Sequence, residues 1–211
     1  MMATDLIVIE PDRPSAEALD RAAAAIRRGA VVAIPTDALY SLIADPFNLR
    51  AVGQVFLAKG RELHRSLPLL VPEPTAAEDL AKEIPARFYV LARRFWPGPL
   101  TIILPAAAKV PLKVTGNTGR LALRQSRSAV ANALLERLGH PLVSTSANIS
   151  GQPTCRSGIE VFGVMDGRVA LVLDGGLCAG PGSTTVDITD PVWKIIREGA
   201  VPGRDVAECL G

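Results

Sequence analysis

Two cations separated by one glycine, Lys59-Gly60-Arg61, are the residues of this sequence best suited to bind phosphate. Lysine supplies a point charge, whereas the planar guanidinium of arginine can donate to two oxygens at once. The triplet lies between residues 48–58, whose apolar spacing predicts a helix, and residues 67–71, which read as a strand. A solvated surface loop can carry the same pattern. The interpretation therefore depends on the other polar segments.

The densest polar segment, residues 144–151, begins at the end of a predicted strand over residues 141–145. Ser144, Ser146 and Asn148 belong to it, and their hydroxyl and amide groups can donate to phosphate oxygens without adding charge. The alternative is an ordinary turn rich in serine, threonine and asparagine. Residues 120–124 alternate charged and apolar side chains, which predicts a strand that places Arg124 at its end.

Three more segments carry polar groups near strand ends. Pro35-Thr36-Asp37 follows a predicted strand over residues 30–34, although such a turn is common in any α/β protein. A glycine-rich piece, residues 180–184, precedes a strand and lacks the Gly-Lys-Ser/Thr ending of a P-loop. Arg197 lies near the end of the last predicted strand, residues 193–198.

These segments require a framework in which strands and helices interleave. Helices are predicted over residues 15–28, 48–58, 128–138 and 157–165, with two more that begin at a Thr75 capping box and after Pro85. The remaining strands are predicted over residues 6–9, 100–104, 169–173 and 185–188. Residues 105–119 lack periodicity and are expected to form a mobile loop over the site. The pattern predicts one α/β domain over residues 1–211 with a largely buried, mixed sheet.

Composition limits the class of protein. The chain has 211 residues, 48% of them hydrophobic, and a net charge of +2, which does not demand nucleic acid as a partner. Three cysteines far apart in the sequence indicate neither a disulfide framework nor a zinc cluster. Without a visible targeting segment or a long apolar run, we expect a cytoplasmic protein that has no contact with a membrane.

Six short motifs occur in an order that resembles the YrdC family of threonylcarbamoyl-adenylate synthases. They are Pro35-Thr36-Asp37 with Tyr40, Lys59-Gly60-Arg61, Trp96-Pro97-Gly98-Pro99-Leu100-Thr101, residues 144–151, Ser183-Thr184 with Asp187, and Ile196-Arg197-Glu198-Gly199. The resemblance spans nearly the whole chain and looks like the short form of the family. It implies a twisted α/β sheet around a deep, positively charged groove.

The resemblance also implies a nucleotidyltransferase. Such an enzyme makes threonylcarbamoyl-AMP and pyrophosphate from L-threonine, bicarbonate or CO2, and ATP, with Mg²⁺ held by the nucleotide phosphates rather than by the protein. The product feeds the N6-threonylcarbamoyladenosine modification of tRNA, so downstream threonylcarbamoyl-transfer proteins are expected partners, together with weak RNA binding.

Site residues follow from the resemblance, motif by motif. Lys59 and Arg61 are expected to be catalytic. The ATP-binding set comprises Lys59, Arg61, Arg124, Ser144, Ser146, Asn148, Thr154 and Arg197, and the threonine-binding set comprises Thr36, Tyr40 and Ser183.

The sequence departs from the family pattern at five positions: Ser41, Glu62, Pro72, Ser128 and Ala129. We expect these changes to fall largely on the amino-acid side and to weaken threonine selectivity. Two alternatives stay open. One is a diverged relative with another carbamoyl or adenylyl acceptor, and the other is a non-catalytic module that binds a nucleotide or RNA.

Overall fold

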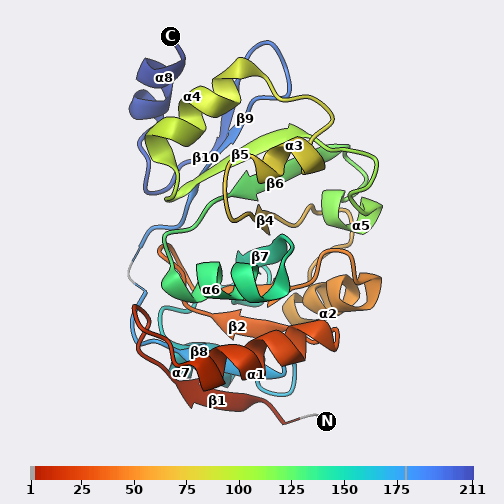
Figure 1. Ribbon diagram of the computed structural model, residues 1–211, viewed down its shortest axis with the longest axis vertical. Coiled ribbons are helices and arrows are strands. Elements are labelled where there is room, and N and C mark those ends of the chain that lie inside the picture. The colour runs from red at the N-terminus through yellow and green to blue at the C-terminus, as the bar shows by residue number, and fades with distance from the viewer. Residues whose placement is uncertain (1–2, 179) are drawn as a thin grey trace.

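A single mixed sheet organises the part of the chain that the computed structural model describes, residues 3–178 and 180–211. Its ten strands follow the order β1-β8-β2-β3-β7-β4-β6-β5-β9-β10 (Figure 1). Their bounds are β1 (Asp5–Val8), β2 (Val32–Ile34), β3 (Ser41–Ala44), β4 (Leu69–Leu70), β5 (Leu100–Pro105), β6 (Arg120–Arg124), β7 (Leu142–Ser146), β8 (Leu171–Asp174), β9 (Thr184–Asp187) and β10 (Lys194–Arg197). Neighbours in the sheet are mostly distant in sequence, so the fold joins remote segments.

Side-chain caps begin four of the eight helices in the described residues (α1, α2, α6 and α7), and glycines end several. They are α1 (Ala16–Arg27), α2 (Leu49–Lys59), α3 (Ala76–Leu80), α4 (Ala86–Phe95), α5 (Leu112–Thr115), α6 (Ala129–Leu138), α7 (Gly158–Met165) and α8 (Gly203–Leu210). Ser15 accepts a hydrogen bond from Ala18 N at the start of α1. Gly60, with φ of 56°, ends α2 in the left-handed conformation that glycine adopts without strain.

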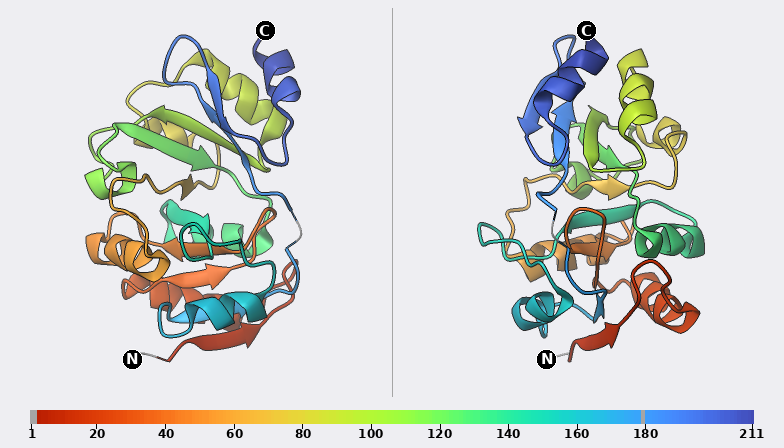
Figure 2. Two further views of the ribbon diagram at one scale, coloured as in Figure 1. Left: turned by 180° about the vertical axis from the view of Figure 1, so that it is seen from behind. Right: turned by 90° about the vertical axis from the view of Figure 1, so that its left-hand side faces the viewer.

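The helices cover both faces of the sheet. α1 packs against α6 on one face, over the buried side chains of β2 and β8. α2 and α7 lie on the opposite face of the same part of the sheet, as the turned views in Figure 2 show. At the C-terminal end of the molecule, α4 packs against α8. The middle of the sheet, between these two helix-covered parts, contains the polar strand segments.

Strand pairing is mixed, as predicted. β1 and β2 are both parallel to β8, whereas β3 is antiparallel to both β2 and β7. β4 and β6 are parallel, and β5 is antiparallel to β6 and parallel to β9. This mixture places the polar ends of β6 and β7 at the centre of the sheet, one on each side of the short strand β4.

Several local predictions were wrong. Thr75 makes no capping hydrogen bond, because its backbone angles (φ −61°, ψ −27°) are already helical. Residues 105–119, expected to be a mobile loop, contain α5, and Gly116 sits against the backbone of His64. Lys59, placed in a loop by the sequence, is the last residue of α2. Three elements were not predicted at all: β3, α5 and α8.

Candidate active site

A cavity of about 260 Å³ opens on the central strands of the sheet. Alternate residues of one strand reach it from the same side, such as Ser144 and Ser146 on β7 and Ala122 and Arg124 on β6. The intervening residues, such as Leu123, belong to the apolar core. The period-two alternation of β6 therefore separates the cavity wall from the buried apolar face, whereas on β7 Thr145 lines the cavity as well.

Three arginines and nine hydroxyl side chains line this cavity. The arginines are Arg61, Arg124 and Arg197, and the hydroxyl residues are Thr36, Ser41, Ser66, Thr101, Ser144, Thr145, Ser146, Ser183 and Thr185. Among the described residues that line it there is no carboxylate. Such a lining favours an anionic ligand, since guanidinium groups and hydroxyls donate hydrogen bonds to oxyanions.

A second hollow of about 450 Å³ adjoins the cavity and shares Arg61 and Ser146 with it. Lys59, Arg65 and Asn148 also line the hollow, and Glu62 lies at its edge. The two spaces together offer room for a ligand with two parts, and Arg61 contributes to both walls.

Arg61 is held at this shared wall by two contacts. Its Nη2 donates to Ser66 O at 2.8 Å, and its Nη1 lies 3.4 Å from Thr145 Oγ1. Nε is buried and has no hydrogen-bond partner within the described part of the chain. Burial lowers the pKa of Arg61, yet the guanidinium stays charged because its ordinary pKa exceeds 12. The site thus contains a fixed, incompletely paired cation.

Lys59 is buried, with 2% of its surface exposed, and its ammonium group points into a turn. Nζ donates to Ser146 O, and to Asn148 O and Asn148 Oδ1 at 3.0 Å each. An ammonium has three N–H groups, so these acceptors use all of them. In this structure Lys59 therefore anchors the turn after β7. It also lines the second hollow, and its contact with phosphate stays a prediction.

Asn148 is equally committed to this turn. Its Oδ1 accepts from Lys59 Nζ and from Ser146 Oγ (2.6 Å), while Nδ2 donates to Ile149 O and Gln152 O. The sequence suggested that the amide would donate to a nucleotide. Both of its N–H groups are used inside the protein, which favours the turn interpretation.

Replacing Asn148 by alanine is therefore expected to destabilise the fold. The variant loses the acceptor of a charged donor and two amide hydrogen bonds, which together contribute about 2–4 kcal/mol to the free energy of unfolding. Urea unfolding of wild type and variant measures this difference. A variant of unchanged stability with weakened ATP binding would instead restore the role predicted from the sequence.

Arg197 and Ser183 meet at the far wall of the cavity. Arg197 Nη2 donates to Ser183 O at 2.8 Å and lies 3.1 Å from Ser183 Oγ, which is itself 2.9 Å from Thr101 Oγ1. Neighbouring strands supply these groups, since β9 lies between β5 and β10. Thr101 was not selected from the sequence as a site residue, although it ends the Trp96-Pro97-Gly98-Pro99-Leu100-Thr101 motif.

The two remaining residues of the predicted threonine-binding set differ in position. Thr36 lines the cavity, but its hydroxyl donates to Leu39 O at 2.6 Å and stabilises the turn. Tyr40 is fully buried, and its hydroxyl donates to Gly176 O and lies 3.2 Å from Asp174 Oδ1. Burial raises the pKa of Tyr40 well above its ordinary value. Tyr40 does not line the cavity, so its expected contact with a substrate is replaced by a structural role.

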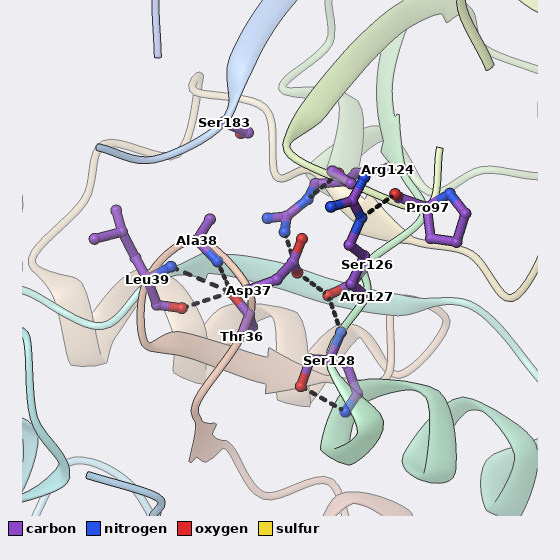
Figure 3. Close-up of polar contacts among 12 residues, drawn as sticks. Thr36, Asp37, Ala38, Leu39, Pro97, Arg124, Ser126, Arg127, Ser128 and Ser183 are labelled. Carbon is purple, nitrogen blue, oxygen red and sulfur yellow. Dashed lines mark hydrogen bonds and ion pairs between the residues drawn. The ribbon is translucent and has the colours of Figure 1, made fainter. Parts of the chain in front are cut away.

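Arg124 contacts an acidic residue that sequence reasoning missed. Its Nε donates to Gly98 O at 3.0 Å and its Nη2 to Asp37 Oδ1, and Ser126 Oγ donates to the same oxygen (Figure 3). Asp37 belongs to the Pro35-Thr36-Asp37 motif, and this motif was the feature of the sequence that could have identified it.

Other predicted positions lie outside the cavity. Thr154 is exposed and lines a separate, largely apolar hollow beside α7. Of the five departures from the family pattern, only Ser41 lines the cavity. Pro72 lines another groove, while Ser128 and Ala129 line a hollow that shares Thr36 and Ala38 with the cavity. Pro72, Ser128 and Ala129 do not line the cavity itself, and their contact with the amino acid stays a prediction.

Residues 3–178 and 180–211 hold no group of three or more histidine, cysteine or acidic side chains able to bind a metal ion. None of the helices in these two ranges has the length and apolar character needed to cross a membrane.

Comparison with known proteins identifies relatives along nearly the whole chain. The family model Sua5_yciO_yrdC, described as Telomere recombination, matches residues 24–199. A threonylcarbamoyl-AMP synthase of Pyrococcus abyssi is 37% identical over 191 residues, which cover 90% of this chain and 56% of that protein. The Coxiella burnetii protein of the same name is 34% identical over 184 residues, covering 86% of this chain and 97% of that protein.

Solved structures show the same fold. The crystal structure of P. abyssi Sua5 complexed with L-threonine superposes with a TM-score of 0.93 at 35% identity, covering 99% of this chain and 61% of the other. Escherichia coli YciO gives a TM-score of 0.87 at 24% identity, which shows the fold alone. The chain spans little more than half the length of its P. abyssi and Bacillus subtilis relatives, 56% in each case. With a family model matched over most of its length, this chain belongs to the Sua5/YciO/YrdC family.

Proposed function

We propose that this protein is a threonylcarbamoyl-AMP synthase that uses L-threonine, bicarbonate or CO2, and ATP. The observation that carries the proposal is the cavity lined by Arg61, Arg124 and Arg197 and by hydroxyl groups, without a carboxylate among its described lining residues. A carboxylate and a polyphosphate both suit such a lining. The P. abyssi and C. burnetii relatives carry this enzyme name, and P. abyssi Sua5 has been solved with L-threonine.

The proposed reaction needs no protein nucleophile. The threonine amine and bicarbonate form a carbamate with loss of water, and a carbamate oxygen then bonds to the α-phosphorus of ATP. The bond from that phosphorus to the bridging oxygen of pyrophosphate breaks, and pyrophosphate leaves with its electron pair. Catalysis consists of holding the carbamate in line and stabilising negative charge on the phosphates.

The two adjoining spaces suggest how the substrates divide. We place threonine in the cavity beside Ser183 and Thr101, whose hydroxyls lie together at its far wall. The triphosphate would extend toward the hollow beside the Lys59 turn, so that Arg61, on the shared wall, faces the phosphates. Ser144, Ser146 and Arg197 are proposed nucleotide contacts. Mg²⁺ would enter on the phosphates of ATP and neutralise part of their charge.

A coupled assay for pyrophosphate release tests the proposal. Release from ATP should require both L-threonine and bicarbonate, and omission of either should reduce it to the level without enzyme. The product would then be available to proteins that transfer threonylcarbamoyl groups to tRNA.

One observation favours a second candidate, a relative with another acceptor. Ser41 lines the cavity at a position where the family usually has glycine, so its side chain occupies ligand space. Pyrophosphate release that needs bicarbonate but prefers a different amine over threonine would support this candidate. If no amine supports pyrophosphate release, the remaining interpretation is a non-catalytic module that binds a nucleotide.

A further inference from the structure

Asp37 occupies an unusual position for an acid near an anion-binding cavity. It lies in the turn between β2 and β3, yet its side chain is only 14% exposed. Oδ1 accepts hydrogen bonds from Arg124 Nη2 and Ser126 Oγ, so one oxygen joins the cavity arginine to a fully buried serine (Figure 3). Asp37 does not line the cavity and instead lines the hollow beside the start of α6.

The turn that carries Asp37 is fixed from within. Thr36 Oγ1 donates to Leu39 O at 2.6 Å and accepts from the backbone N–H groups of Ala38 and Leu39, at 3.2 Å each. These three bonds close the turn around a single hydroxyl. They limit the positions available to the neighbouring Asp37 carboxylate.

The same turn is also tied to the start of α6. Ser128 Oγ donates to Pro35 O at 3.1 Å and accepts from Ala131 N, as an N-cap does. Ser128 N in turn donates to Ser126 Oγ at 3.1 Å. Asp37 is thus held through Pro35, which precedes it in the same turn, and through Ser126, which precedes α6.

Arg124 needs this support because it is buried and lies near a second cation, Arg197. Its side chain is 8% exposed. Burial and the nearby charge of Arg197 both lower its pKa, whereas Asp37 raises it. The bonds to Gly98 O and Asp37 use Nε and one N–H of Nη2, while Nη1 has no hydrogen-bond partner within the described residues. Arg124 lines the cavity, so the unpaired Nη1 of its guanidinium is available to a ligand there.

We propose that Asp37, braced by Ser126, is a positioning residue that orients Arg124 to bind an oxyanion in the cavity. The inference rests on the proposed function only in naming that oxyanion as the carboxylate of threonine or a phosphate of ATP. Asp37 itself does not touch the ligand and acts through Arg124.

Calorimetric titrations of Asp37→Asn with L-threonine, ATP and pyrophosphate test the proposal. The probe whose oxyanion contacts Arg124 should bind about 10- to 100-fold more weakly, the effect of losing one charge-assisted hydrogen bond. A loss of affinity confined to threonine would mean that Arg124 binds the threonine carboxylate. A loss confined to ATP and pyrophosphate would mean that Arg124 binds a phosphate. Asp37→Glu, which keeps the charge, should recover most of the affinity, and Ser126→Ala should lose about 3- to 10-fold.

Asp187 provides a matched control. Its side chain is 7% exposed, against 14% for Asp37. It pairs with Arg120 at 2.6 Å and accepts from the Thr189 hydroxyl at 2.6 Å, but neither it nor Arg120 lines the cavity. Asp187→Asn therefore removes the same kind of contact and should leave all three affinities within about 2-fold. This comparison separates loss of positioning from general loss of stability.

A double-mutant cycle tests whether Asp37 acts through Arg124. In an Arg124→Met background, Asp37→Asn should change the affinity by less than about 3-fold. An equal loss of affinity in both backgrounds would overturn the inference. Unchanged binding of every probe by folded Asp37→Asn would overturn it too, as would a wild-type protein that binds none of the three probes. Failure of the proposed function gives a different result. In that case oxyanion binding still depends on Asp37, but the protein does not release pyrophosphate in a reaction that requires threonine and bicarbonate.

Discussion

Replacing Arg61 by alanine is expected to lower the turnover of pyrophosphate release by about 100- to 1,000-fold, the usual effect of removing one group that stabilises transition-state charge. Arg61 lies on the wall shared by the cavity and the adjoining hollow. Ser66 O fixes its Nη2 at 2.8 Å, so the guanidinium needs little reorganisation as charge develops on the phosphates. Single-turnover rates at saturating ATP and threonine measure the loss.

Two further variants sharpen this test. Arg61→Lys retains a charge but loses the planar fork, and it should recover only part of the rate. Arg21→Ala removes a surface arginine that pairs with Asp5, and it should leave turnover unchanged. Turnover within about 3-fold of wild type in folded Arg61→Ala would mean that the shared wall is not where the phosphates react.

Much of the fold could be predicted because its elements carry strong local signals. Ser15 and Gly29 bracket α1, and Ser128 and Gly139 bracket α6, at the positions that the sequence indicated. The missed elements lack such signals. β3 has four residues, all buried, and therefore shows no alternation. α8 has only eight residues, one of them fully buried (Val206), and is too short for a helical period to be read with certainty from the sequence.

The site was predictable in composition but not in the role of each side chain. The family resemblance implied that Arg61, Arg124 and Ser146 belong together, and the fold places all three on one cavity. Spacing could not show that the amide of Asn148 is used within its own turn. Neither could it show that Tyr40 turns away from the cavity, because both outcomes depend on contacts between segments distant in sequence.

Lys59 illustrates the same difficulty with a consequence for stability. A cation in a surface loop, where the sequence placed Lys59, would contribute little to the free energy of unfolding. In the structure Lys59 is buried at the end of α2 and donates three hydrogen bonds to Ser146 and Asn148. Burial, followed by the charge of Arg61, lowers the pKa of Lys59 from 10.5 to about 8.

This lowered pKa predicts that activity falls as pH rises through about 8. A neutral amine has two N–H groups and cannot donate to all three acceptors, so the turn beside the phosphate hollow loosens. If only the protonated form supports catalysis, the rate should drop about 10-fold per pH unit above 8. Lys59→Arg keeps its charge throughout this range and should lose the drop, at a lower maximal rate. An unchanged fall through pH 8 in Lys59→Arg would assign the titration to another group.

Stability should move in the opposite direction over the same window. Between about pH 8 and 10.5 the unfolded lysine holds its proton while the folded one has released it. The unfolded state therefore binds more protons, and the contribution of Lys59 to the free energy of unfolding rises with pH. Urea unfolding of wild type and Lys59→Met at pH 7 and pH 10 isolates this contribution as the change in their difference. Wild type should gain stability relative to Lys59→Met at the higher pH while it loses activity. A relative loss of stability instead would mean that the folded protein holds the Lys59 proton more tightly than the unfolded chain, contrary to the lowered pKa.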